Sequence, residues 1–319
     1  MNLENKIKQK ILALLTVIVL FIIVGILFFL ISWNNKEVTN NLKAKVLSIK
    51  TAKEDILRLN RIQIATSTPI IESLSFLTLG VTESGGNKIL MQKNPDWALP
   101  IASITKLMTA LVTLENVSSE TEIKATTDYI GREESAFILE TDKIYKVKDL
   151  VANMLISSDN DSARLLSSAL GEANFIAKMN MKASELGLDK TNFVNVTGLD
   201  PQPPKVGVNI SSPNNLAKLI LYIKAHYPKI LSLSAEPEYN FCDIQKYCKI
   251  VVNTDKLLSN KDFKFKILGG KTGSTDLAGK NLILLMNIEP KIYLINIVLN
   301  AKDNFAETTS LINNVTVVN

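Results

Sequence analysis

Histidine and cysteine are scarce in this chain of 319 residues, and their scarcity narrows the chemistry that the chain can support. The only histidine is His226, in the stretch KAHYP, where we expect a surface or capping residue at a helix end. A Ser-His-Asp triad is therefore disfavoured, because that chemistry needs a histidine beside its serine. One histidine and two cysteines without paired CxxC spacing also argue against a zinc site. The sequence thus predicts no metal and no other cofactor.

Over most of the chain, positively and negatively charged side chains are equal in number. Residues 1–75 contain ten Lys or Arg and five Asp or Glu, whereas residues 76–319 contain 26 of each sign. The formal net charge of +5 therefore lies entirely in the N-terminal part. Because nucleic-acid binding needs a basic surface, the sequence predicts no nucleic-acid partner.

One long apolar run separates the N-terminus from the rest of the chain. Residues 11–31 contain no charged residue, and three lysines precede them within residues 1–10. A run of this length can span a bilayer as one helix, and the preceding lysines place the N-terminus in the cytoplasm. A cleaved signal peptide is the alternative, but its apolar region is shorter and small residues follow it, whereas SWNNKE follows here. The sequence predicts a cytoplasmic stub (1–10), a transmembrane anchor (11–33), a helical stalk or linker (34–74) and an extracytoplasmic catalytic domain (75–319).

The two cysteines, Cys242 and Cys248, lie close together in FCDIQKYCKIVV. Residues that favour β-strands flank both, so we predict a hairpin with a disulfide across its strands. Such a bond persists outside the cytoplasm. Two unrelated thiols are the alternative.

Strand and helix patterns are segregated along the main domain. SFLTLGV and NKILMQ predict a hairpin around ESGG, helical patterns follow, and the last hundred residues are mostly strands before a final helix. Residues 125–148 are expected to be irregular. Segregation favours an antiparallel sheet with helices over a doubly wound parallel sheet. We therefore predict an α+β fold with an antiparallel sheet of about five strands.

Three short polar clusters interrupt the apolar pattern of this domain. Each alone is weak, because a serine near a helix start is commonly an N-cap and Lys-Thr-Gly is commonly a strand end. The clusters are Ser103 and Lys106 in LPIASITKLMTALVTLE, Ser158, Asp159 and Asn160 in SSDNDS, and Lys271, Thr272, Gly273 and Ser274 in GGKTGS. In the order Ser-x-x-Lys, Ser-x-Asn and Lys-Thr-Gly, separated by 55 and then 113 residues, they form the signature of active-site-serine penicillin-recognising enzymes.

The surrounding sequence resembles the D-alanyl-D-alanine carboxypeptidases, which are low-molecular-mass penicillin-binding proteins. The stretches that carry the resemblance are PIASITKLMTALVTLE, MLISSDNDSARLL, ASELGLDKTNFVNVTGLD and LGGKTGSTDLAGKNL, and it runs from about residue 75 to about residue 300. The resemblance implies the penicillin-recognising fold, which is also that of class A β-lactamases. Helices are then expected on both faces of the sheet, with the site between the sheet and the helical part.

Two acidic residues, Asp159 and Glu185, resemble features of class A β-lactamases. The middle motif of this family usually has a small residue where this chain has Asp159, a choice familiar from class A β-lactamases. We expect the Asp159 side chain to point away from the cleft. Glu185 in SELGL superficially resembles the deacylating glutamate of those β-lactamases, but its neighbours fit the carboxypeptidase helix better, so we expect a structural role.

The motif residues receive roles from their chemistry together with the resemblance. Ser103 is the expected nucleophile, and a base must take its proton because a serine hydroxyl is a poor nucleophile. Lys106 lies one helical turn on and serves as that base if its amine is neutral. Burial, the helix N-terminus and the second cation, Lys271, should each lower the pKa of Lys106. Ser158 is expected to pass the proton to the leaving amine.

The remaining motif residues are expected to bind substrate. Asn160 should hydrogen-bond the substrate's peptide amide, while Lys271 and Thr272 should hold its terminal carboxylate. The backbone N–H groups of Ser103 and Ser274 should form the oxyanion hole. Gly273 lets the strand backbone approach the substrate closely.

The expected activity is hydrolysis of the terminal D-Ala from peptidoglycan stem peptides through an acyl-serine, with β-lactams as covalent inhibitors. A D,D-endopeptidase and a β-lactamase are the nearest enzymatic alternatives. A membrane-anchored β-lactam or muropeptide sensor with little turnover is an alternative of another class. The expected location is the cell membrane, with the catalytic domain outside the cytoplasm.

Overall fold

The computed structural model of the protein describes residues 3–65, 70–131, 139–201, 207–261 and 263–318. These residues form two compact units, Met1–Asp55 and Ile56–Asn319. Residues 1–2 of the predicted stub and residues 66–69 of the predicted stalk lie outside the described part of the chain.

A single long helix makes up the first unit. This helix, α1 (Leu3–Asn60), continues through most of the predicted stalk and ends in the second unit. Among the residues that the structure describes, no helix combines the length and the hydropathy needed to cross a membrane. The transmembrane anchor predicted at residues 11–33 therefore stays a prediction.

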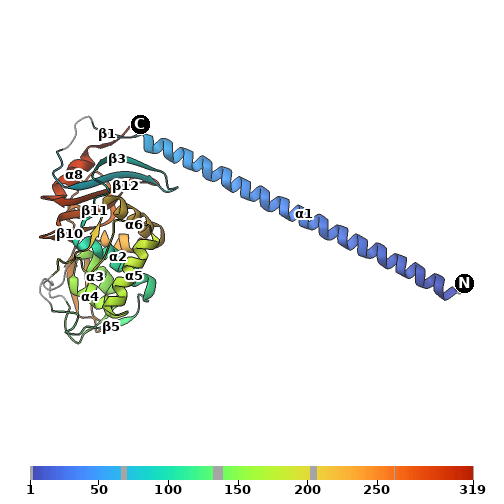
Figure 1. The fold of residues 1–319 in the computed structure, drawn as a ribbon, viewed down its shortest axis with the longest axis horizontal. Coiled ribbons are helices and arrows are strands. Elements are labelled where there is room, and N and C mark those ends of the chain that lie inside the picture. The colour runs from blue at the N-terminus through green and yellow to red at the C-terminus, as the bar shows by residue number, and fades with distance from the viewer. Residues whose placement is uncertain (1–2, 66–69, 132–138, 202–206, 262, 319) are drawn as a thin grey trace. The chain divides into compact units, whose positions relative to one another are not determined.

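A five-stranded antiparallel sheet forms the centre of the second unit (Figure 1). Its strand order is β10-β11-β12-β2-β3, and short turns join β10 to β11, β11 to β12 and β2 to β3. Turns this short connect only antiparallel neighbours. The strands are β2 (Ser75–Thr82), β3 (Asn87–Lys93), β10 (Lys266–Thr275), β11 (Gly279–Glu289) and β12 (Ile292–Ala301). The predicted α+β fold with five antiparallel strands is confirmed.

Both faces of the sheet are covered, and the alternation of side chains along β11 shows how. Ile283 and Leu285 point into the larger hydrophobic core, which the helical layer completes. Leu282 and Leu284 point to the opposite face and join a second cluster. Helix α8 (Asn304–Asn313) packs on this second face against β11 and β12 (Figure 1). A strand buried on both faces explains why β11 lacks the polar alternation of a surface strand.

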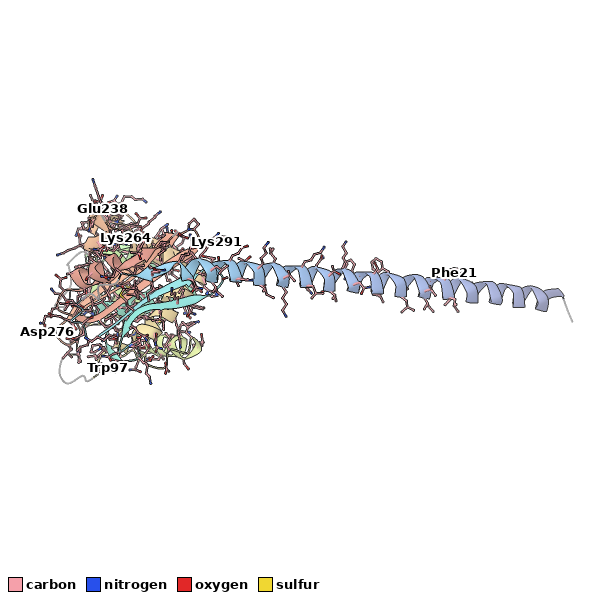
Figure 2. The ribbon with its side chains drawn as sticks, turned by 90° about the horizontal axis from the view of Figure 1, so that it is seen from above. Phe21, Trp97, Glu238, Lys264, Asp276 and Lys291 are labelled. Carbon is pink, nitrogen blue, oxygen red and sulfur yellow. A yellow bond between two sulfur atoms is a disulfide. The ribbon has the colours of Figure 1, made fainter. Side chains whose placement is uncertain are left out.

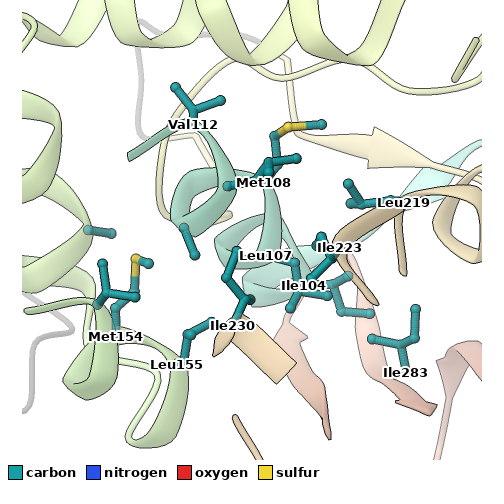
Figure 3. Close-up of a cluster of buried hydrophobic side chains, with 14 of the residues drawn as sticks. Ile104, Leu107, Met108, Val112, Met154, Leu155, Leu219, Ile223, Ile230 and Ile283 are labelled. Carbon is teal, nitrogen blue, oxygen red and sulfur yellow. The ribbon is translucent and has the colours of Figure 1, made fainter. Parts of the chain in front are cut away.

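Helix α2 (Lys106–Asn116) lies in the middle of the helical layer. Leu107 and Met108 are fully buried, and Figure 3 shows them in one cluster with Leu155 of the neighbouring α3 (Val147–Ile156) and Ile223 of α6 (Pro213–His226). Truncating a buried leucine to alanine typically costs about 2–5 kcal/mol, so this packing fixes α2 firmly against its neighbours. The residues at its N-terminus thus stand on rigid support.

The remaining helices largely follow the predicted pattern. The predicted break within SSDNDS is confirmed, because one helix ends at Ile156 and the next begins at Asn160. The predicted helix start at Ser103 is a 3-10 turn, and a further short helix after Pro228 was not predicted. The elements are η1 (Ala102–Thr105), α3 (Val147–Ile156), α4 (Asn160–Ser168), α5 (Glu172–Glu185), α6 (Pro213–His226), α7 (Pro228–Ser234) and η2 (Lys256–Ser259).

Four two-stranded ladders complete the described fold. In β8–β9 the predicted hairpin is confirmed, since Cys242 pairs directly with Cys248 and the two form a disulfide. The β5–β6 ladder places a strand inside the range 125–148 that the sequence predicts to be irregular. The ladders are β1 (Ile62–Ile64) with β13 (Val315–Val317), β4 (Leu99–Pro100) with β7 (Ile210–Ser211), β5 (Glu122–Lys124) with β6 (Ile144–Lys146), and β8 (Glu238–Cys242) with β9 (Cys248–Val252).

Candidate active site

Ser103 lies in the turn η1, directly before α2, and backbone encloses this turn from two sides. The preceding Ala102 has a φ of 47°, a left-handed conformation that non-glycine residues rarely adopt. A Cβ atom on Gly198 would lie 1.9 Å from the Ala102 carbonyl oxygen, and one on Gly273 would lie 2.8 Å from the Ile101 carbonyl oxygen. Only glycine fits at these two positions, so both neighbouring segments approach the serine at backbone distance.

Lys106 is the first residue of α2, and its amine contacts three oxygen atoms. Its Nζ lies 2.7 Å from Ser103 Oγ, 2.8 Å from Asn160 Oδ1 and 2.8 Å from the Thr197 carbonyl oxygen. The amide and carbonyl oxygens only accept hydrogen bonds, whereas a hydroxyl also donates. An ammonium group would donate to all three oxygens, whereas a neutral amine would donate to Asn160 and Thr197 and accept the Ser103 proton on its lone pair.

The surroundings of Lys106 favour this neutral form. The side chain is fully buried, and burial is the largest cause that lowers its pKa well below the ordinary value of 10.5. The nearby charges of Lys271 and Arg164 lower this pKa further, while Asp159 raises it. The direction is set by burial, because an ammonium group loses most of its hydration there. The predicted lowering of the Lys106 pKa agrees with this arrangement.

Asp159 has a capping role, which is common for a Ser-Asp-Asn turn. It is the N-cap of α4, where its Oδ2 accepts a hydrogen bond of 2.7 Å from the Ser162 backbone N–H. Burial raises the pKa of its carboxyl. The expectation that Asp159 simply points away from the cleft is therefore incomplete, because its charge still acts on Lys106. The neighbouring Ser158 has a φ of 63°, so the turn before α4 is also left-handed.

The third motif lies on β10, the edge strand of the sheet. Lys271 is buried, and its Nζ donates to the Thr272 carbonyl oxygen at 3.2 Å and to Thr272 Oγ1 at 3.4 Å. The Thr272 hydroxyl lies 2.6 Å from the hydroxyl of Thr254. Ser274, next to Gly273, is exposed. The lysine and the hydroxyls of Thr272 and Ser274 thus lie close together near the end of this strand.

Lys271 holds its proton weakly. Burial lowers its pKa to about 7, although the charge of Asp255 opposes this shift. Burial likewise raises the pKa of Asp255 to about 6, and the carboxylate accepts a 3.0 Å hydrogen bond from the Leu257 N–H. Near neutral pH, Lys271 is therefore partly protonated, and an anionic substrate group beside it would favour the charged form.

The structure brings the three sequence motifs together at one place. Ser103, Lys106 and Asn160 are joined by direct hydrogen bonds, although Asn160 lies 54 residues from Lys106 in the chain. Gly273 contacts the η1 turn, and Lys271 acts on Lys106 through its charge. Ser158 precedes Asn160 by two residues, and Ser274 follows Gly273 directly.

Sequence reasoning missed a segment at residues 195–198. The Thr197 carbonyl accepts from Lys106, and Gly198 packs against the turn that carries Ser103. Asn195 Oδ1 shapes this segment by accepting from the backbone N–H groups of Thr197 at 3.1 Å and Gly198 at 2.6 Å. The signal in the sequence was the stretch NVTG, whose Asn and Gly are typical of a tight turn with positive φ.

His226 and Glu185, for which the sequence predicts no catalytic role, lie outside this site. His226 is exposed, and its Nδ1 lies 3.0 Å from the Tyr222 carbonyl oxygen at the end of α6, as expected for a capping residue. Glu185 forms an ion pair of 2.7 Å with Lys182 within α5, in agreement with a structural role. Within the described residues, no group of three or more His, Cys, Asp or Glu side chains is arranged to hold a metal ion.

Comparisons with known proteins agree with this geometry. Residues 63–303 match the D-alanyl-D-alanine carboxypeptidase family, peptidase family S11. A D-alanyl-D-alanine endopeptidase from Pseudomonas aeruginosa is 29% identical over 254 residues, which cover 76% of this chain and 78% of the relative. A D-alanyl-D-alanine carboxypeptidase from Mycobacterium tuberculosis is 28% identical over 70% of this chain and 74% of the relative. The ampicillin-bound structure of penicillin-binding protein D2 from Listeria monocytogenes superimposes with a TM-score of 0.67, 27% identity and coverage of 77% of this chain and 98% of that one.

The tight packing of Gly198 leads to a first prediction. In Gly198→Ala the new Cβ must displace either Ala102 or the Thr197 carbonyl, because it would lie 1.9 Å from the Ala102 oxygen. A misplacement of about 1 Å can cost about 100-fold in rate, so we expect labelling by a fluorescent penicillin to slow by at least about tenfold. Gly171→Ala is the matched control, since Gly171 also has a positive φ, 78°, but faces open space. Equal labelling rates in the two variants would contradict the packing argument.

Proposed function

The chain belongs to the D-alanyl-D-alanine carboxypeptidase family, and we propose that it hydrolyses the terminal D-Ala-D-Ala bond of peptidoglycan stem peptides through an acyl-enzyme at Ser103. The observation that carries the proposal is the 2.7 Å contact between Lys106 Nζ and Ser103 Oγ. It is made by a buried amine whose other two partners, Asn160 Oδ1 and the Thr197 carbonyl, only accept hydrogen bonds.

The acylation step uses the neutral amine as its base. Lys106 takes the proton of the Ser103 hydroxyl while Oγ forms a bond to the carbonyl carbon of the penultimate D-Ala. Negative charge develops on the carbonyl oxygen, and the N–H groups of Ser103 and Ser274 hold it, each donor contributing roughly 3–4 kcal/mol. The C–N bond then breaks, and the leaving amine receives a proton through Ser158. The free D-Ala departs, and an ester remains on Ser103.

Substrate recognition falls to the residues around this centre. Asn160 accepts from, or donates to, the peptide amide of the stem peptide, while its Oδ1 also holds Lys106 in place. Lys271 and Thr272 bind the terminal carboxylate, with a charge and a hydroxyl on the same strand. Water then attacks the ester carbon and gives one proton to the Lys106 amine. The bond between that carbon and Ser103 Oγ breaks, Lys106 returns the proton to Oγ, and the shortened peptide leaves with a free carboxyl group. β-Lactams acylate the same serine, and the ampicillin-bound structure of penicillin-binding protein D2 supports this part of the proposal.

A D,D-endopeptidase is the second candidate function, because three of the similar relatives bear that name. Both reactions use one acyl-serine, and they differ in whether the leaving amine belongs to a free D-Ala or to a cross-linked side chain. Mass spectrometry of the products from a pentapeptide and from cross-linked muropeptide dimers separates the two. Rapid release of hydrolysed penicillin would instead indicate a β-lactamase, and a persistent adduct without peptide cleavage would indicate a sensor.

We further propose that residues 11–33 anchor the enzyme in the cell membrane with its catalytic part outside the cytoplasm. The absence of charge from residues 11–31 and the lysines at positions 6, 8 and 10 support this orientation. The disulfide between Cys242 and Cys248 is also in keeping with an oxidising compartment.

The role of Ser103 is tested by its removal. We expect Ser103→Ala to abolish both penicillin labelling and release of D-Ala from a pentapeptide, with an unchanged circular dichroism spectrum, because a methyl group cannot form the acyl ester. Ser232→Ala changes an exposed serine and should retain both activities. Undiminished labelling in Ser103→Ala would remove Ser103 from the nucleophile role.

The protonation state of Lys106 sets the pH dependence of acylation. Its pKa is lowered from 10.5, so the neutral fraction and the acylation rate should rise with pH and level off well before that value. Lys106→Arg should be nearly as inactive as Lys106→Ala, because a guanidinium stays charged. The measurement is the acylation rate against pH for all three proteins. Substantial activity in Lys106→Arg would mean that Lys106 acts only as a fixed charge.

The anchor is tested by deletion. A protein lacking residues 1–33 should remain soluble and react with penicillin at the rate of the full chain, because every motif residue lies beyond position 100. The full chain should sediment with membranes and the shortened protein should not. Aggregated, inactive material would indicate that the deleted segment packs into the catalytic unit.

A further inference from the structure

Asp200 follows the segment that holds Lys106, and its carboxylate contacts the opposite side of the active site. Its Oδ1 accepts a 2.7 Å hydrogen bond from the Thr275 hydroxyl, and its Oδ2 accepts a 2.9 Å hydrogen bond from the Leu277 backbone N–H. The Thr275 hydroxyl in turn accepts from the Ala278 N–H at 3.2 Å. One carboxylate therefore holds the turn that ends β10 and begins β11.

This turn directly follows Ser274, whose N–H is one of the two proposed oxyanion donors. β10 is the edge strand of the sheet, so β11 pairs with it on one side only. The pairing ends with Ser274 opposite Lys280 and Thr275 opposite Gly279. Asp276 lies in the turn and reaches the surface (Figure 2). Asp200 supplies two hydrogen bonds that fix this strand end and the turn after it.

The same short segment also fixes the other half of the site. Three residues before Asp200, the Thr197 carbonyl accepts from Lys106, and Gly198 packs against the Ala102 backbone beside Ser103. Six residues, 195–200, thus contact both Lys106 and the end of β10, and they fix the distance between the proposed base and the strand that carries Ser274. An oxyanion hole is effective only when its donors are already aimed at the transition state.

We propose that Asp200 is a positioning residue that aims the Ser274 N–H into the oxyanion hole by tying the end of β10 to the segment that orients Lys106. The proposal rests on the proposed function, because it needs Ser274 to act as an oxyanion donor. It concerns the rate of acylation, not substrate affinity, since Asp200 itself touches neither the serine nor the carboxylate-binding residues.

The test compares Asp200→Ala and Asp200→Asn with wild type in the reaction with a chromogenic β-lactam. We expect the limiting acylation rate to fall by about 10- to 100-fold in Asp200→Ala, because oxyanion donors act in the transition state, whereas the initial binding constant should change less than about threefold. Asp200→Asn keeps one acceptor but places an N–H₂ group near a second N–H donor, so it should lie between the two. Rates are expressed per titrated active site, so that unfolded protein does not contribute.

Two further variants separate positioning from general stability. Thr275→Val removes one partner of Asp200. The variant that combines Asp200→Ala with Thr275→Val should be acylated no more slowly than Asp200→Ala alone, because both changes break one linkage. Asp303→Ala removes a similar capping carboxylate, which accepts from Phe305 and Ala306 in α8 away from the site; it should lower the melting temperature without slowing acylation.

The outcomes are distinguishable from failure of the proposed function itself. Wild type that forms no covalent adduct would overturn the proposed function. Wild-type acylation with an unchanged rate in Asp200→Ala, a change confined to the binding constant, or additive effects of Asp200→Ala and Thr275→Val would each overturn the positioning role. A slower limiting rate with unchanged binding and no additivity is the result that the structure predicts.

Discussion

The buried amine of Lys106 is the constraint on which the rest of the active site depends. A lysine can be fully buried at low cost only if it gives up its charge or finds strong partners, and its three neighbours here are oxygens without a paired carboxylate. Two of these oxygens only accept, which leaves the lone pair of a neutral amine for the Ser103 proton. In the proposed mechanism, the same feature that would be a defect in an ordinary core makes Ser103 reactive.

Three separate parts of the fold are needed to keep this amine in place. The core packing of α2 fixes its backbone, the cap of α4 fixes Asn160, and the turn at residues 195–198 fixes the Thr197 carbonyl. Each part would be unremarkable alone. Together they surround one nitrogen atom, so a change in any of them is expected to alter the chemistry before it unfolds the protein.

Much of this could be predicted from the sequence, for identifiable reasons. The three motifs match, in residue type and order, the signature of active-site-serine penicillin-recognising enzymes. Strand patterns that are segregated from the helix patterns along the chain favour an antiparallel sheet. The carbonyl of Thr197 could not be predicted. It is a backbone group whose direction comes from Asn195 and the packing of Gly198, which only the folded chain brings beside Ala102.

Titration of the Lys106 amine tests most directly whether this amine is neutral and able to act as the base. In protein labelled with ¹³C and ¹⁵N at lysine, the Lys106 side-chain resonance is identified by its absence from a Lys106→Met variant, and its chemical shift is followed with pH. The pKa of Lys106 should lie well below 10.5, the ordinary value for a lysine side chain. A Lys106 resonance that titrates at that ordinary value would contradict a neutral base and, with it, the proposed route to the acyl-serine.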